Sequence, residues 1–283
     1  MRLPFVRVGV VGHVEWVEFA RVARVPQPGE IIRATAWWSE AAGGGSVSSV
    51  QLARITGACT LYTALGRDEV GESALEQLTG HGVTVEAARH DEPQRRGFTF
   101  VDADRERTIT IIGEKHVPRA ADSLAWEALA GADAVYFVSG DAGALRAARA
   151  ARVLVATARV LPTIAQAGVE LDALVRSGSD PSERYEPGDL DPAPGLVVTT
   201  AGRRGGSWSA ADGRTGAYEA TPLPGPLEDS YGAGDSFAAG LTYALGLGLP
   251  PEKALEFAAR LGAEALTRSG AHGAATPLAP RAR

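Results

Sequence analysis

Short apolar runs alternate with amphipathic segments along most of the chain. The predicted strands are β-branched or apolar runs bounded by turn residues, and they cover residues 6–11, 61–65, 134–139, 153–156, 173–176 and 196–200. Helical spacing predicts helices over residues 46–55, 120–129, 143–151 and 161–167, and another that begins near Gly234. Strands joined by helices pair in parallel, so this order predicts an α/β fold with a mainly parallel central sheet.

Two further segments have the partial alternation of extended chain, over residues 30–38 and 98–112. The second contains a charged turn at residues 102–107, which predicts a hairpin. We expect these segments to form a small separate sheet. Residues 182–194 are rich in Pro, Gly and acidic groups, and a loop and a short helix both stay open there.

Composition and charge restrict the class of partner. The chain has 283 residues, 45% hydrophobic and 22% charged, so it can bury one large core, with a small appendage as the default. A net charge of -6 with scattered basic residues predicts no nucleic-acid partner. The arginine pairs Arg95-Arg96 and Arg203-Arg204 could still meet a small phosphorylated ligand, although such pairs are more often solvated surface.

A single cysteine, Cys59, excludes an internal disulfide and any multi-cysteine metal site, which fits a reducing cytoplasm. The apolar run near the N-terminus is short and soon followed by Glu15 and Glu18, so we expect neither a signal peptide nor a membrane partner. Histidine spacing for zinc, a serine nucleophile elbow and a Walker-type phosphate loop are not found in the sequence.

The most informative stretch is a glycine-rich turn that leads into an apolar helix, Asp229-Ser-Tyr-Gly-Ala-Gly-Asp-Ser-Phe237. The backbone amides of Gly232, Ala233 and Gly234 can converge on an anion at the positive end of the helix. Asp235 in the first turn could accept a proton from an attacking hydroxyl. The plainer interpretation is a tight turn followed by an acid that the helix dipole favours.

This stretch resembles the D-T-x-G-A-G-D-x-F signature of the PfkB, or ribokinase-like, carbohydrate kinase family, from which only Ser230 departs. The resemblance implies a ribokinase-like three-layer α/β/α fold with a small β-sheet lid. It also implies an ATP-dependent kinase that phosphorylates a hydroxyl of a small sugar or sugar-like metabolite, with Asp235 as general base. A nucleoside kinase of the same fold and a non-catalytic sugar- or nucleotide-binding regulator are the alternatives.

Other segments are similar to the family's nucleotide and metal motifs. Thr200, Gly202 and Gly205 follow an apolar strand and match the T-x-G-x-x-G turn at the nucleotide site. Glu183 matches the glutamate of N-x-x-E, which implies that it helps to hold Mg2+ through water, with support from Asp229. A solvated acidic loop is an equally common explanation for Glu183 when the segment is judged alone.

The substrate motifs are less complete. Gly43 and Gly44 resemble the family's di-glycine turn, but Ser48 and its neighbouring serines stand where an asparagine is usual, and helix capping explains them equally well. Val17 occupies the place of an aspartate that binds substrate hydroxyls, so we predict that Glu15 supplies the missing carboxylate. This departure leaves the acceptor open, with sugar ranked above nucleoside.

The resemblance covers the whole chain as one kinase domain, residues 1–283, with lid segments at about 14–40 and 95–113. Closure of a lid would exclude water, which competes with the acceptor for the phosphoryl group. In many relatives the lids of two subunits pack together, which implies a homodimer. Many relatives require a monovalent cation, and the resemblance leaves such a requirement open for this chain.

Overall fold

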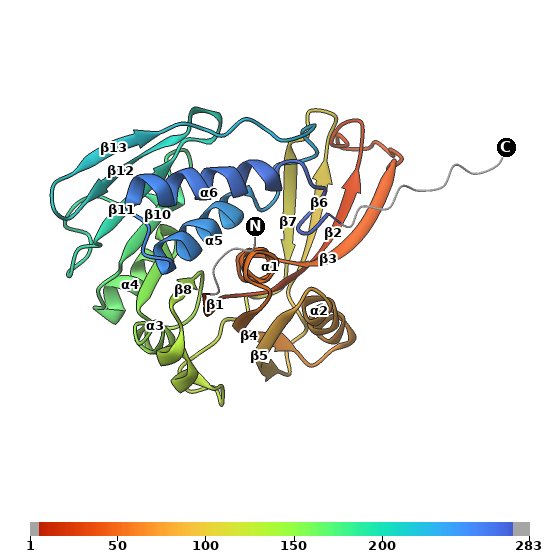
Figure 1. The fold of residues 1–283 in the computed structure, drawn as a ribbon. Helices are drawn as coiled ribbons and strands as arrows, with labels where there is room; N and C mark the ends of the chain where they lie inside the picture. Colours follow the sequence, from red (N-terminus) through yellow and green to blue (C-terminus); the bar gives the residue numbers. More distant parts are fainter. Residues whose placement is uncertain (1–5, 274–283) are drawn as a thin grey trace.

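The computed structural model of the chain describes residues 6–273 and contains a large central sheet and a second, smaller one (Figure 1). In spatial order the central strands are β13 (Thr215–Tyr218), β12 (Gly206–Ala210), β11 (Leu196–Thr200), β10 (Ala173–Ser177), β9 (Val153–Thr157), β8 (Ala134–Phe137), β1 (Val8–Val11), β4 (Cys59–Gly66) and β5 (Val83–His90). Neighbours pair in parallel from β11 to β5, whereas β12 and β13 are antiparallel. The predicted mainly parallel sheet is confirmed.

Helices cover both faces of this sheet, because strands buried on both sides need an apolar layer on each. One face carries α1 (Gly44–Thr56), α2 (Glu69–Gly80), α5 (Ala233–Gly246) and α6 (Pro251–Ala265). The other carries the 3₁₀ helix η1 (Trp126–Gly131), α3 (Ala142–Ala148) and α4 (Leu161–Ala167). Along β1, Val8 and Val10 enter the first core and Val11 the second, so the strand alternation divides the apolar residues between two layers.

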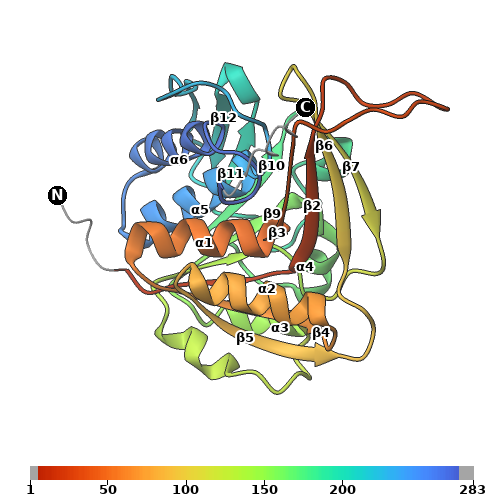
Figure 2. The same cartoon turned by 90° about the vertical axis from the view of Figure 1, so that its right-hand side faces the viewer.

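The smaller sheet stands apart from β10–β13 in Figure 1, and its strands contact α1 and α2, beside which they lie in Figure 2. Its strand order is β3 (Ala36–Ala42), β2 (Glu15–Arg21), β6 (Arg96–Val101) and β7 (Arg107–Ile112). The predicted hairpin over 98–112 is therefore confirmed as β6 and β7. The predicted single-domain range of 1–283 begins and ends in residues 1–5 and 274–283, which lie outside the described residues.

The predicted helix over residues 120–129 is wrong in its first half, which consists of turns before η1. The Asp122 carboxylate accepts a hydrogen bond from the Arg119 amide at 2.7 Å, and its carbonyl accepts one from Trp126 Nε1 at 3.2 Å. These local bonds satisfy the chain without a helical ladder. Residues 182–194, where loop and short helix were both open, hold a 3₁₀ turn at their start and are otherwise irregular.

A backbone crossing at the end of β1 brings the first strand against the start of α1. A Cβ atom on Gly45 would lie 2.6 Å from the His13 carbonyl oxygen and 2.8 Å from the Gly12 carbonyl carbon. A Cβ atom on Gly12 would lie 2.9 Å from the Gly45 Cα. Only glycine at both positions allows this approach, which puts the N-terminus of α1 directly behind the loop that follows β1.

We predict that Gly45→Ala lowers the free energy of unfolding by about 1–3 kcal/mol, because the added methyl group overlaps rigid backbone rather than a movable side chain. Gly80→Ala at the end of α2 is the matched control, because a Cβ atom there meets nothing within 4 Å. That control should be neutral or stabilising by up to about 1 kcal/mol. Urea unfolding of the two variants measures the difference, and equal stabilities would contradict the proposed crossing.

Candidate active site

Asp235 lies in the first turn of α5, where this helix meets α1. Gly232 precedes the helix in the left-handed conformation, with φ of 72°, and a Cβ atom there would lie 2.9 Å from Val47 of α1. A Cβ atom on Gly44 would lie 2.9 Å from the Asp235 Oδ1 and 2.6 Å from Val138 Cγ1. The two glycines therefore let the Asp235 carboxylate rest on the backbone of α1.

The surroundings of Asp235 change its acidity. Burial raises the pKa of its carboxyl from the ordinary value of 3.8 to about 6, opposed by the charges of Arg107 and Arg159 and assisted by Glu183 and Glu15. The side chain still keeps part of its surface accessible. An accessible carboxylate with this pKa is ionised at neutral pH and is basic enough to take a proton from a hydroxyl as bonds change.

The N-terminus of α5 is open to an anion. No side chain of the described residues caps the helix, and a Cβ atom on the exposed Gly234 would meet nothing within 4 Å. The first amides of a helix have no intrahelical acceptor, so those of Ala233 and Gly234 are available to an approaching phosphate. Anion binding at this turn stays a prediction, which the uncapped helix start allows.

The loop before α5 is fixed by a buried carboxylate. Asp229 is fully buried, and its two oxygens accept hydrogen bonds from the Tyr231 amide at 2.8 Å and the Gly270 amide at 2.6 Å. Burial raises the pKa of this carboxyl, and the two amides oppose that shift. Tyr231 in turn accepts a hydrogen bond on its hydroxyl oxygen from the Gly43 amide at 3.3 Å. Asp229, predicted at the nucleotide site, therefore holds the loop through main-chain bonds.

Ser48, predicted as a substrate ligand, is fully buried in α1. Its hydroxyl donates a hydrogen bond to the Asp235 carbonyl oxygen at 3.4 Å. This contact joins α1 to the first turn of α5, so the serine is placed to orient the helix that carries Asp235. Its role toward substrate stays a prediction.

Glu15 begins β2 and lies on the other side of the di-glycine turn. A Cβ atom on Gly43 would lie 3.2 Å from Glu15 Cγ, and Glu15 Oε1 lies 3.1 Å from Arg95 Nε and 3.6 Å from His13 Nε2. Burial raises the pKa of the Glu15 carboxyl, while Arg95 and Lys115 lower it. The structure thus brings Glu15, Gly43, Gly44 and Asp235 into one continuous region, and their role toward substrate stays a prediction.

His13 is a neutral neighbour in this region. Its Nδ1 forms a hydrogen bond with Ser139 Oγ at 3.0 Å, and burial, followed by the charges of Lys115, Arg95 and Arg159, lowers its pKa well below the usual value. A neutral imidazole can position a ligand hydroxyl without adding charge.

Glu183 is a further buried carboxylate, and its charge acts on Asp235. Its Oε2 accepts a hydrogen bond from the Ser177 amide at 2.7 Å, and its Oε1 is paired with Arg159. Arg159 also contacts Asp180 Oδ2 at 2.8 Å. Sequence reasoning missed Arg159, although its position just after a predicted strand marks it as a residue at the carboxyl edge of the sheet.

Within residues 6–273, no three or more His, Cys, Asp and Glu side chains gather in a cluster that could hold a metal ion alone. Magnesium bound to nucleotide phosphates keeps several waters and needs only one or two protein carboxylates. Glu183 fits that requirement through an intervening water, because both of its oxygens already have protein partners.

Thr200 ends β11, and Gly202 and Gly205 lie in the turn between β11 and β12; binding of nucleotide there stays a prediction. Gly202 and Gly205 have φ of 56° and 75°, and a Cβ atom on Gly205 would lie 2.0 Å from the Tyr218 carbonyl oxygen. Glycine therefore allows this sharp turn at the carboxyl end of β11.

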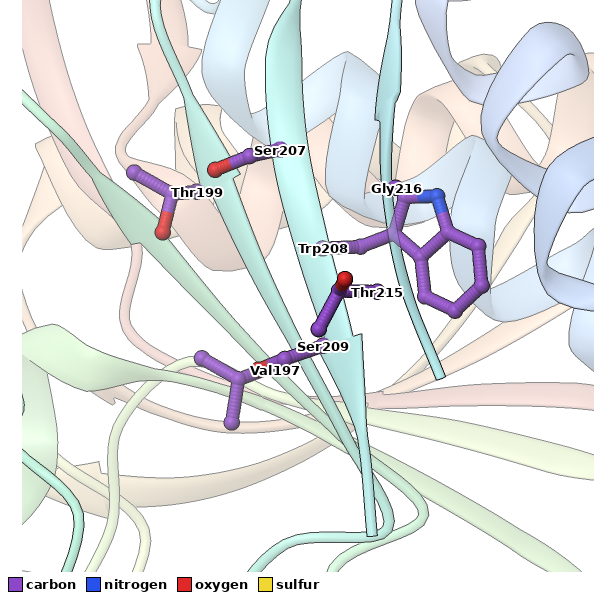
Figure 3. Close-up of a pocket in the computed structure, with 7 residues that line it drawn as sticks. All are labelled: Val197, Thr199, Ser207, Trp208, Ser209, Thr215 and Gly216. Atoms are coloured by element: carbon purple, nitrogen blue, oxygen red, sulfur yellow. The ribbon is translucent and has the colours of Figure 1, made fainter. Parts of the chain in front are cut away.

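A shallow cavity of about 400 Å³ lies elsewhere, on the surface of β11, β12 and β13 (Figure 3). Its lining includes Val197, Thr199, Ser207, Ser209 and Thr215 and none of the predicted site residues. The cavity is therefore separate from Asp235. Across the described part of the chain, no helix is long and apolar enough to cross a bilayer.

Comparisons with known proteins agree with this geometry. The sequence model of the pfkB family carbohydrate kinases matches residues 7–184 and 190–277. The chain is 27% identical over 304 residues to an ATP-dependent ribose-1-phosphate kinase of Halopiger xanaduensis, covering 96% of this chain and 95% of that one.

Solved structures share the fold. A putative ribokinase from Agrobacterium tumefaciens superposes with a TM-score of 0.79 at 21% identity, covering 96% of this chain and 94% of that one. The Arabidopsis thaliana ribokinase complexed with ribose and ATP gives a TM-score of 0.73 at 19% identity, covering 94% of each chain. The predicted ribokinase-like fold is confirmed.

We predict that Asp235→Asn stabilises the fold at neutral pH. The folded carboxyl has a pKa of about 6 and the unfolded one 3.8, so ionisation disfavours the folded state above pH 6 and has no effect below pH 4. The variant should be more stable by roughly 1–3 kcal/mol at pH 7, and this gain should vanish as the pH falls from 6 to 4. Thermal or urea unfolding across that range tests it; a gain that is independent of pH would contradict it.

Proposed function

Because the chain belongs to the pfkB family of carbohydrate kinases, we propose that it transfers the γ-phosphoryl group of ATP to a sugar hydroxyl activated by Asp235. The observation that supports this assignment is the accessible Asp235 carboxylate beside the uncapped N-terminus of α5. Base and anion site belong to one helical turn, so the hydroxyl and the phosphoryl group are held side by side.

In this reaction Asp235 takes the proton of the acceptor hydroxyl, the hydroxyl oxygen forms a bond to the γ-phosphorus, and the bond from that phosphorus to the bridging oxygen of ADP breaks. The amides of Ala233 and Gly234 donate to the phosphoryl oxygens while negative charge is redistributed. Bound Mg2+ would supply further positive charge at the phosphates, with Glu183 holding one of its waters.

Arg159 is a cation among the carboxylates of Asp180, Glu183 and Asp235. It pairs with Glu183 and Asp180 and lowers the pKa of Asp235. We assign Arg159 two tasks: it orients Glu183, and it keeps Asp235 ionised at neutral pH. Without this cation, the pKa of Asp235 would rise further under burial.

The acceptor is placed between Glu15, the di-glycine turn at Gly43 and Gly44, and Asp235. Ribose 1-phosphate is named in the activity of the Halopiger relative, and ribose is the ligand named for the Arabidopsis ribokinase. A pentose is therefore the first acceptor to test. Glu15 would accept hydrogen bonds from its hydroxyls, as carboxylates do for sugars.

The smaller sheet serves, in this proposal, as a lid over that acceptor. Its inner face contributes Val17, Phe19 and Trp38 to a core shared with Tyr231, next to the loop that bears the anion site. Ile109 and Ile111 on the same face remain 40% and 41% exposed. Closure over a bound sugar would cover them and remove water from the transfer site.

The outer face of the lid combines large apolar residues with the Glu18–Arg96 ion pair. Register places Trp37, Phe98, Phe100 and Ile112 on this face, with Trp37 49% and Ile112 55% exposed. Exposed large apolar side chains beside an ion pair suit a protein–protein contact. We assign it to a second copy of this chain, which gives a homodimer with paired lids.

For catalysis, we expect Asp235→Asn to lower kcat by about 100- to 10,000-fold, the usual range for loss of a general base, with little change in ATP binding. Wild-type kcat/KM should rise with pH and level off above a pKa near 6. Both kcat and kcat/KM are obtained by measuring the release of ADP with ribose as the acceptor. Asp212→Asn, in the exposed turn between β12 and β13, is the control. Undiminished turnover in Asp235→Asn would refute the assignment.

For assembly, Trp37→Glu combined with Ile112→Glu should convert the dimer to monomer, because the buried face would then contain two unpaired charges. Leu249→Glu, which places a charge at a 36% exposed leucine between α5 and α6, is the control and should leave the dimer intact. Sedimentation velocity measures the mass. A wild-type chain that sediments as a monomer at all concentrations would contradict the lid-mediated dimer.

A further inference from the structure

Tyr231 stands immediately before the turn that starts α5, at a position that the family signature leaves open. Its side chain is buried. The backbone on both sides of it is fixed, because the Tyr231 amide donates to Asp229 Oδ1 at 2.8 Å and Gly232 follows in the left-handed conformation. The side chain therefore projects from an ordered part of the loop, and whatever it contacts acts directly on the turn.

The Tyr231 hydroxyl reaches the di-glycine turn, where the acceptor is placed. Its oxygen accepts a hydrogen bond from the Gly43 amide at 3.3 Å, across 188 residues of sequence. A Cβ atom on Gly43 would lie 3.2 Å from Glu15 Cγ, and one on the next residue, Gly44, would lie 2.9 Å from Asp235 Oδ1. One side chain therefore connects the turn between Glu15 and Asp235 with the loop that leads into α5.

The ring of Tyr231 contacts two strands of the small sheet. Phe19 of β2 meets it edge-on, with 5.0 Å between the ring centroids, and the guanidinium carbon of Arg107 in β7 lies 5.5 Å from its centroid. This second distance is that of a cation–π contact. Arg107 Nη1 also donates to the Ser230 carbonyl oxygen at 2.8 Å. Arg107 thus binds both the ring and the backbone beside it.

A further arginine of the small sheet holds the same loop. Arg21, the last residue of β2, lies 3.1 Å from Glu228 Oε2 and donates to Ser269 Oγ at 2.9 Å. The small sheet therefore contacts the loop before α5 at Glu228 and at Ser230, through two different strands. Movement of this sheet would break both contacts, so the conformation of the loop depends on where the sheet lies.

We propose that Tyr231 is a positioning residue for phosphoryl transfer: it aligns the di-glycine turn with the anion turn and, through Arg107, makes this alignment depend on contact with the small sheet. This inference rests on the proposed kinase function and gives two further residues a task in it. Alignment matters because the acceptor oxygen and the phosphoryl group react only from a narrow range of positions. Dependence on the sheet restricts efficient transfer to the state in which the lid covers the site and water is excluded.

The charge of Arg107 agrees with this task. After burial, which is the largest cause and raises the pKa of Asp235, the charges of Arg107 and Arg159 lower that pKa. Glu183 and Glu15 oppose the two cations. Arg107 belongs to the small sheet, whereas Arg159 follows β9 of the central sheet. Contact of the small sheet with the loop therefore also favours the ionised, proton-accepting form of Asp235.

Tyr231→Phe tests the link to the di-glycine turn, because it keeps the ring and removes only the acceptor of the Gly43 amide. We expect kcat with ribose to fall about 2- to 10-fold, the usual worth of one hydrogen bond, while KM for ATP stays unchanged. Tyr62→Phe is the matched control: the Tyr62 hydroxyl also makes one 3.3 Å hydrogen bond to backbone, at Ala125, and the residue packs in the other core layer. Equal kcat values in the two variants would overturn the positioning role.

Arg107→Met and Arg107→Lys separate contact from charge. Both should raise the ratio of ADP to sugar phosphate formed, because water then competes for the phosphoryl group. In Arg107→Met, kcat/KM should level off at higher pH than in the wild type, since a cation that lowers the pKa of Asp235 is lost. Arg107→Lys should return that profile toward the wild type. Arg214→Met is the matched control, because Arg214 lies over Trp208, 6.0 Å from its ring centroid. A wild-type ratio and pH profile in Arg107→Met would refute the proposal.

Hydrogen exchange measured by mass spectrometry separates this failure from failure of the proposed function, because it needs no turnover. Peptides that cover residues 228–234 should exchange faster in Arg107→Met than in the wild type or in Arg214→Met. Faster exchange in a protein that phosphorylates no acceptor would support the contacts of this loop and contradict the kinase assignment. Transfer that depends on Asp235, with unchanged exchange and an unchanged product ratio, would contradict the positioning role and leave the kinase intact.

Discussion

Close packing against the backbone of glycines is the constraint on which the rest of the structure depends. At three places around the site, Gly12 against Gly45, Gly44 against Asp235 and Gly232 against Val47, a single β-carbon would not fit. These contacts bring the end of β1, the start of α1 and the start of α5 within van der Waals distance. At this junction lie the uncapped N-terminus of α5 and the Asp235 carboxylate. The glycines thus convert three separate chain segments into one site.

Charge is distributed unevenly across that site. Around Asp235, the carboxylates of Asp180, Glu183 and Asp235 itself outnumber the two cations that act there, Arg107 and Arg159. On the other side of the di-glycine turn, the Glu15 carboxylate is paired with Arg95.

Sequence patterns correctly predicted turns and helices that a few neighbouring residues specify. The motif around Asp235 specifies a turn and a helix within a few residues, and α4 was predicted with its observed bounds, 161–167. Helix α2 was missed although the Asp68 carboxylate caps it through the Gly71 amide, a pattern visible in the sequence. By contrast, the first half of residues 120–129 has helical composition, but Asp122 engages neighbouring backbone and favours turns.

Contacts between segments far apart in the sequence could not be predicted from local patterns. Arg159 meets Glu183 because β9 and β10 are neighbours in the sheet, and nothing in either local sequence indicates that pairing. Arg95 and Arg96 were predicted only as an arginine pair. Arg95 pairs with Glu15 and Arg96 with Glu18, and nothing in the local sequence separates these two partners.

The hydrogen bond from the Gly270 amide to Asp229 has a consequence for synthesis on the ribosome. Asp229 orders the loop before α5, yet one of its two amide partners comes from the segment beyond α6. A nascent chain that has not reached Gly270 leaves this buried carboxylate with only its local amide partner, so the loop before α5 is less stable. Complete ordering of that loop therefore waits for the late segment to emerge.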